Sequence, residues 1–247
     1  MRVLSSLAMT AALLLGTSMA NAQRAGPPTF ENSMAQRALA CTHCHGSQGR
    51  AAPDGYYPRI AGKPAGYIYN QLLNFRDERR HYGPMTQLLA TLSDDYLMAI
   101  ATHFSSLQVP YPAPVGSAAP AAVLERGRQL VQQGDASRQV PACAQCHGQR
   151  MTGVLPNVPG LLGLPRDYLN AQLGAWRSGK RRAHAPDCMA DIAKALQPQD
   201  IESVAHWLAA QPVPVDSKPV APNSNRDGLK PGSVPTCGTA DRMAARP

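Results

Sequence analysis

The sequence predicts an all-α protein made of two tandem copies of one small helical domain. Three observations support this fold class. An internal repeat covers most of the chain. Within each copy, apolar residues recur at spacings of three and four, as on one face of a helix. No run shows the β-branched alternation that is typical of strands. The repeat carries most weight, because segments that match at a fixed offset indicate two copies of one fold.

The repeat is visible in three blocks. Cys41-Cys44-His45 recurs as Cys143-Cys146-His147 about a hundred residues later. The segments PRIAGKPAGYIYNQLLNFR and PGLLGLPRDYLNAQLGAWR then align at a constant offset, and MTQLLATL aligns with MADIAKAL further on. The matching pairs of the middle block are Pro58/Pro159, Gly62/Gly163, Pro64/Pro165, Tyr67/Tyr168, Gln71/Gln172, Leu72/Leu173 and Arg76/Arg177.

Helices are expected in the same places in each copy. Pro64 and Pro165 each stand where the first turn of a helix is expected. Ser93, followed by two aspartates, is a helix cap with an acidic first turn, and Pro198 lies near the start of the corresponding helix. The expected helices are residues 33–40, 64–76 and 92–107 in the first copy, and 122–132, 165–177 and 196–210 in the second.

Composition shifts along the chain predict the domain organisation. The segment VPYPAPVGSAAPAA is rich in Pro and Ala and predicts a semi-stiff linker. A Pro- and Ser-rich tail with few apolar residues should be largely irregular. The expected parts are a signal peptide at 1–22, a first domain at 23–109, a linker at 110–121, a second domain at 122–212 and the tail at 213–247.

The first 22 residues predict export. Arg2 precedes an apolar stretch at 7–15, and Ala20-Asn21-Ala22 has the small-x-small pattern of a signal-peptidase site. The apolar stretch is too short to span a bilayer, and no later segment is long and apolar enough either. The sequence therefore predicts a periplasmic protein without a membrane span, cleaved near Ala22-Gln23. Any membrane association would come through a partner.

The composition bears on partners and on the core. The formal net charge is +8, which favours docking to protein partners with acidic surfaces. Nucleic acid is a poor candidate, because the protein is exported and has no Lys/Arg-rich recognition stretch. Aromatic residues make up only 5% of the chain, so two small domains of about 100 residues each need another source of buried apolar surface.

The repeated Cys-x-x-Cys-His motif predicts covalent haem. Two cysteines three apart share a face of a helix, so their thiols can attack the two vinyl groups of one haem while the next histidine reaches the iron. This is the attachment signature of c-type haem. A zinc site would gather four ligands locally, a redox dithiol would need a βαβ context, and a disulfide would leave the repeated histidine unexplained. Cys41, Cys44, Cys143 and Cys146 are therefore expected to bind two haems, with His45 and His147 as iron ligands.

A methionine is expected as the sixth ligand of each iron, because Met suits an electron carrier. Met85 and Met189 stand in register in the repeat, and each precedes an expected helix by the same interval. His81 and His184, a few residues upstream, are the alternatives, and they would give two bis-His haems of lower potential.

With these motifs in place, the chain resembles the cytochrome c4 family, which are di-haem class I c-type cytochromes. The resemblance covers residues 31–212 and includes FRDERR…PM…LSDD in the first copy, WRSGKRR…M…L in the second, and CHG after each motif. It implies two cytochrome domains related by a pseudo-twofold axis, each wrapped around its haem. Gly127 matches the glycine at the family's helix crossing, whereas SMAQRA in the first copy has none. Trp207 matches the aromatic residue of the last helix, for which the first copy has His103-Phe104.

Two cysteines and two basic stretches remain. In an oxidising compartment Cys188 and Cys237 are expected to pair, which would fasten the tail across the Met189 loop. The alternatives are free thiols, pairing with another chain, or a Cys188 thiolate on the iron. Two basic stretches stand at matching places in the repeat, RDERRH and RSGKRRAH. They are either solvated helix ends or groups that contact haem propionates or an acidic partner.

These observations predict a periplasmic electron carrier that moves single electrons, with no catalytic residue because both irons have six ligands. The family resemblance implies a route from a quinol-oxidising complex or a dehydrogenase to a terminal oxidase. The alternatives are a dedicated subunit of one periplasmic dehydrogenase and a di-haem peroxidase with one open iron.

Overall fold

The computed structural model describes residues 31–52, 55–222 and 236–239. Residues 32–247 form one unit, in which the two halves of the repeat contact each other. The predicted signal peptide at 1–22 lies outside the described residues, as does most of the predicted tail. Five of the predicted helices are present, with ends that differ by a few residues, and the one expected at 33–40 is divided.

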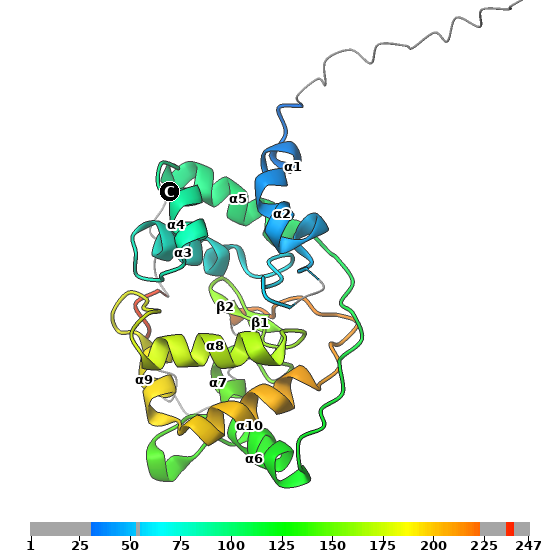
Figure 1. The fold of residues 1–247 in the computed structure, drawn as a ribbon, viewed down its shortest axis with the longest axis vertical. Helices are drawn as coiled ribbons and strands as arrows, with labels where there is room; N and C mark the ends of the chain where they lie inside the picture. Colours follow the sequence, from blue (N-terminus) through cyan, green and yellow to red (C-terminus); the bar gives the residue numbers. More distant parts are fainter. Residues whose placement is uncertain (1–30, 53–54, 223–235, 240–247) are drawn as a thin grey trace, which may run out of the picture. The chain divides into compact units, whose positions relative to one another are not determined.

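The first half consists of helices around the first Cys-x-x-Cys-His motif (Figure 1). The expected helix at 33–40 is instead two helices that meet at Ala38, the second of which carries the motif. Ser93 caps its helix as predicted, because its side chain accepts a hydrogen bond from the Tyr96 backbone. The elements are α1 (Met34–Arg37), α2 (Leu39–His45), η1 (Ser47–Gly49), α3 (Ala65–Arg76), α4 (Gly83–Leu89) and α5 (Asp94–Ser106).

The second half repeats the order of the α-helices. Its last helix begins with a capping box between Gln197 and Asp200, and Pro198 occupies the first turn, where its missing N–H costs nothing. Its helices are α6 (Ala121–Gln132), η2 (Ala136–Arg138), α7 (Cys143–His147), α8 (Arg166–Arg177), α9 (Cys188–Ala195) and α10 (Pro198–Ala209).

A small hairpin departs from the expectation of helices alone. Strands β1 (Gly153–Val154) and β2 (Val158–Pro159) pair antiparallel just after the second motif. Strands of two residues are too short to show any alternation, so the sequence could not predict them. The carbonyl of Val220, in the predicted tail, accepts a hydrogen bond from the Leu155 amide and attaches that segment to the hairpin.

Each half has its own hydrophobic cluster. Phe104, Leu97 and Ile68 centre the first, and Leu130, Val131 and Leu208 centre the second. In the second half α6 crosses α10 at Gly127, where a Cβ atom would lie closer than 3.0 Å to the Ser203 carbonyl oxygen. The glycine match to the family therefore has a direct steric cause in this chain.

The predicted linker is largely exposed, but it is attached to both halves at particular residues. The Arg59 side chain donates to the carbonyls of Val109 and Pro110, and its guanidinium stacks 3.8 Å above the Tyr111 ring. Ser117 is hydrogen-bonded to His206 at 2.9 Å. Among the described residues, no helix combines the length and apolar character that crossing a membrane requires.

Candidate haem site

One cavity of about 1260 Å3 runs through the interior and is lined by both halves. Its volume exceeds the roughly 300–1,000 Å3 that is usual for one small-molecule site. All of the sequence-predicted site residues line it: Cys41, Cys44, His45, Met85, Cys143, Cys146, His147 and Met189. The fold therefore brings together the residues that the repeat singled out.

The two motif histidines are held in the same way. His45 Nδ1 lies 2.8 Å from the Pro58 carbonyl oxygen, and His147 Nδ1 lies 2.8 Å from that of Pro159. With Nδ1 donating its proton, Nε2 is left as an unprotonated nitrogen that can bind a metal. Burial lowers the pKa of both histidines, which keeps them neutral as a metal ligand requires. Pro58 and Pro159 were matched in the repeat, but their role as acceptors was not predicted.

The four motif cysteines form no disulfide, and three of them have thiols that are poorly suited to a redox dithiol. Burial raises the pKa of Cys41, Cys146 and Cys143, the last to about 12. A reactive dithiol needs a lowered thiol pKa instead. In the described part of the chain, no three His, Cys, Asp or Glu side chains are grouped to bind a metal ion together. Their place in the wall of the cavity fits residues that would attach a cofactor covalently.

Met85 and Met189 both line the cavity, each in the first turn of a short helix. Of the two histidine alternatives, His81 also lines the cavity. His184 is not among the described lining residues. The geometry of the second half thus favours Met189 over His184 as the residue that faces the cofactor.

Two buried arginines meet where the halves join. Arg80 is 9% exposed and Arg181 is 4% exposed, and no described carboxylate lies within ion-pair distance of either. Arg80 donates to Gln172 at 2.6 Å and Arg181 donates to Gln71 at 2.9 Å, so each arginine reaches across to the other half. Burial, together with the nearby Arg80 charge, lowers the pKa of Arg181. Two buried cations that have no carboxylate partner among the described residues are suited to binding an anionic group.

Each arginine stacks on an aromatic ring that also lines the cavity. The Arg80 guanidinium lies 4.4 Å from the centroid of Phe75, and that of Arg181 lies 3.7 Å from that of Trp176. Trp176 Nε1 is buried without a hydrogen-bond partner among the described residues. An apolar cavity edged by two buried cations and an unsatisfied N–H fits a flat apolar group that carries carboxylates, as haem does with its propionates.

Comparison with known proteins agrees with this geometry. No family model matches the chain. It is 37% identical to the thiosulfate dehydrogenase electron acceptor of Thiomonas intermedia, over 71% of this chain and 80% of that protein. It is 32% identical to cytochrome c4 of Pseudomonas aeruginosa, over 70% of this chain and 84% of that protein. The chain belongs to the cytochrome c4 family. It is therefore a di-haem c-type cytochrome and an electron-transfer protein rather than an enzyme, with proteins as redox partners.

Two solved structures share the fold of this cytochrome c4 family member. Reduced recombinant cytochrome c4 from Pseudomonas stutzeri superposes with a TM-score of 0.61 at 27% identity, covering 72% of this chain and 96% of that one. Thiosulfate dehydrogenase (TsdBA) from Marichromatium purpuratum gives a TM-score of 0.63 at 30% identity. That match covers 70% of this chain but only 36% of the TsdBA chain.

One cation of this cytochrome departs from the repeat. Lys63 is buried and donates to the Gly160 carbonyl of the other half at 2.7 Å. Burial and the nearby Arg59 lower its pKa to about 7. The matching residue of the second half is Leu164, so this cation has no counterpart on the other side of the cavity. A repeat alignment shows the difference, but only the fold shows that the side chain is buried between the halves.

The two remaining cysteines are paired. Cys188 and Cys237 form a disulfide with a Cα–Cα distance of 5.7 Å, which confirms the expected bridge. Since the Cys188 sulfur is bonded, it supplies no thiolate to the neighbouring cavity.

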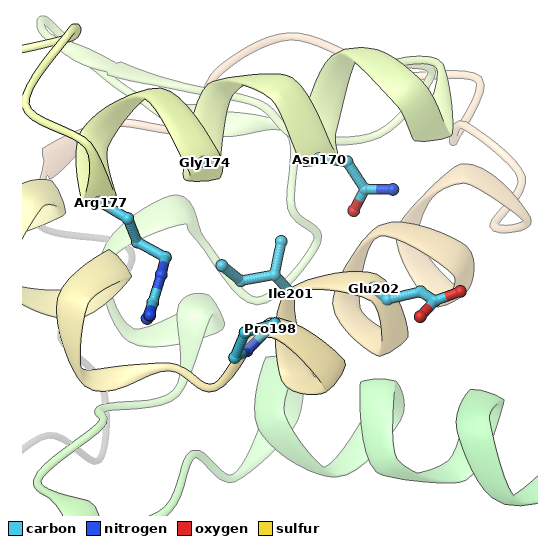
Figure 2. A pocket seen from close by; sticks show the side chains of 6 residues that line it. All are labelled: Asn170, Gly174, Arg177, Pro198, Ile201 and Glu202. Atoms are coloured by element: carbon cyan, nitrogen blue, oxygen red, sulfur yellow. The ribbon is translucent and has the colours of Figure 1, made fainter.

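A second, shallow pocket of about 340 Å3 lies outside the haem site (Figure 2). It is lined by Asn170, Gly174, Arg177, Pro198, Ile201 and Glu202. From α8, Arg177 donates to the Leu196 carbonyl just before α10. Arg76, its match in the repeat, makes the same bond to Leu92 in the first half. The pocket thus borders a structural contact between helices and contains none of the site residues.

Proposed function

We propose that this cytochrome accepts single electrons from a periplasmic dehydrogenase, with thiosulfate dehydrogenase as the first candidate, and passes them to a further acceptor. Two relatives at 37% and 36% identity bear the name thiosulfate dehydrogenase electron acceptor, which supports this donor. The observation that carries the proposal is the cavity shared by both motifs, because it allows one redox group to lie in each half within one unit.

Each residue has a defined part in this function. The two bound irons supply one-electron chemistry. Cys41, Cys44, Cys143 and Cys146 would hold the cofactors by thioethers, and His45 and His147 would bind the irons through Nε2. Met85 and Met189 would be the second protein ligands of the irons. The same proposal includes two cytochrome domains, at 23–109 and 122–212. It also includes a signal peptide at 1–22, which is cleaved when the chain is exported to the periplasm.

A basic ridge marks the proposed docking face for an acidic partner. The segments after α3 and α8 pair antiparallel, with the His81 amide bonded to the Lys180 carbonyl at 3.1 Å. Because side chains alternate along extended backbone, Arg80 and Arg181 point inward while His81, Lys180 and Arg182 are exposed. Lys180 and Arg182 have no ion-pair partner among the described residues. The ridge, defined as His81, Lys180 and Arg182, thus lies directly above the buried arginine pair.

Charge reversal on the ridge tests the proposal. Purified holoprotein is mixed with thiosulfate dehydrogenase and thiosulfate, and haem reduction is followed by absorbance. The Lys180→Glu/Arg182→Glu variant should be reduced at least tenfold more slowly at low ionic strength, since steering charges set the association rate. The difference should shrink as salt screens the charges.

Lys194→Glu/Lys218→Glu is the matched control. It makes the same change of net charge at exposed positions away from the ridge, and it should stay within about threefold of the unmodified chain. Equal slowing by both double variants would contradict the ridge. Reduction by ascorbate shows that the haems of the unmodified chain are redox-active. If thiosulfate dehydrogenase then failed to reduce this chain, the proposed donor would be excluded.

A further inference from the structure

A short described part of the tail lies against the methionine side of the second half. Cys237 is bonded to Cys188, the first residue of α9, and Met189 follows at once. We call residues 236–239 the C-terminal clasp. Thr236, Cys237 and Thr239 of the clasp line the large cavity, so the clasp forms part of its wall.

The clasp lies close against the loop that leads to Met189. The Gly238 amide donates to the Pro186 carbonyl at 2.9 Å. A Cβ atom on Gly238 would lie closer than 3.0 Å to the carbonyl oxygens of Ala185 and His184, so only glycine permits this approach. The disulfide and this backbone contact together hold the clasp on the residues just before Met189.

The end of the clasp is also tied to both halves. The Thr239 carbonyl accepts from Asn157 Nδ2 at 3.1 Å in the second half, and from Asn70 Nδ2 at 3.4 Å in the first. Because the Thr239 carbonyl accepts from one residue of each half, the end of the clasp lies where the two halves meet.

The first half has no such cover among the described residues. Met85 stands behind Gly83-Pro84 in a helix without a disulfide. In this half Leu88 is 44% exposed and Tyr56 is 62% exposed, although both line the cavity. Asn157, which binds the clasp, is the counterpart of Tyr56 in the repeat. The two methionine loops are therefore unequal: the clasp is bonded to the loop before Met189, and no described segment is bonded in this way to the loop before Met85.

We propose that Cys237 and Gly238 are positioning residues that hold Met189 in place and close the second haem to external ligands, while the first haem stays accessible. The proposal rests on the proposed function, since it takes Met189 as an iron ligand. A methionine ligand yields to an external ligand only while it is displaced. Restraining the loop that carries it thus lowers the apparent affinity of that iron for competitors.

The test is imidazole binding to the oxidised holoprotein, followed by loss of the long-wavelength methionine–iron band. Met85→Ala and Met189→Ala assign the two binding steps to the two haems. In the unmodified protein the first haem should bind imidazole at least tenfold more tightly than the second. Cys237→Ser should raise the affinity of the second haem at least tenfold and leave that of the first unchanged, with two haems still bound.

Gly238→Ala should act in the same direction, because it displaces the clasp while both cysteines remain. Val215→Ser, a change at a fully exposed tail residue, should change neither affinity. Should a variant not fold, the unmodified protein can be treated with a phosphine that cleaves the disulfide, alkylated, and reoxidised with ferricyanide before the same titration.

Unchanged imidazole affinities after loss of the disulfide would overturn the clasp proposal. That failure differs from failure of the ligand assignment. If Met189→Ala left the methionine–iron band at full strength, Met189 would not be a ligand at all, whatever the clasp does.

Discussion

Replacing Cys143 and Cys146 together by serine should leave the chain with one covalent haem and an unfolded second half. Both thioethers of that haem are lost, and the cavity then lacks its filling. At about 24 cal/mol per Å3, half of the 1260 Å3 cavity would cost about 15 kcal/mol. That is the upper end of the roughly 5–15 kcal/mol by which whole domains are stable.

The haem count and far-ultraviolet circular dichroism measure this effect. One haem per chain and about half of the helical signal are expected, because the first half keeps its own hydrophobic cluster. Cys188→Ser/Cys237→Ser is the control, since it also removes two cysteines but should keep two haems and full helicity. Full helical content in the Cys143→Ser/Cys146→Ser chain would show that haem does not support the second half.

The second large effect is expected at Arg181. Arg181→Met removes a buried cation that we place beside the haem carboxylates, and loss of one partner of a buried ion pair costs about 3–5 kcal/mol. The hydrogen bonds to Gln71 and Gln172 are lost as well. Because a positive charge near the haems favours their reduced state, the variant should also have lower reduction potentials.

Denaturant unfolding of the oxidised holoprotein gives the change in stability. Arg182→Met, the exposed neighbour, makes the same change of charge and should stay within about 0.5 kcal/mol of the unmodified chain. If the two variants were equally stable, Arg181 would have no anion beside it, and the fit of haem carboxylates to this site would be wrong.

The sequence was sufficient for the parts that depend on local spacing. Cysteines three apart with a following histidine, repeated in register, led directly to the family. Ser93 and Pro198 marked helix starts because capping depends on residues within one turn. Met85 and Met189 could be singled out because the repeat gave each the same place relative to a helix.

The remaining features depend on contacts between distant segments. Pro58 and Pro159 matched in the repeat, yet nothing local shows that their carbonyls accept from histidines of the motifs. Arg80 and Arg181 stood in stretches that also fitted solvated helix ends, and only the meeting of the halves shows that they are buried. Gly238 lies on the Met189 loop because of the disulfide between Cys188 and Cys237. The cysteine count could suggest this pairing, but it could not show where the tail lies.

The most direct test of the account is an optical spectrum of the protein as isolated, oxidised and then reduced, with a pyridine haemochrome count. The account predicts two c-type haems per chain and a methionine–iron band of the strength of two methionine-ligated irons. Two haems without that band would move the sixth ligands away from Met85 and Met189, and a colourless protein would contradict the haem site altogether.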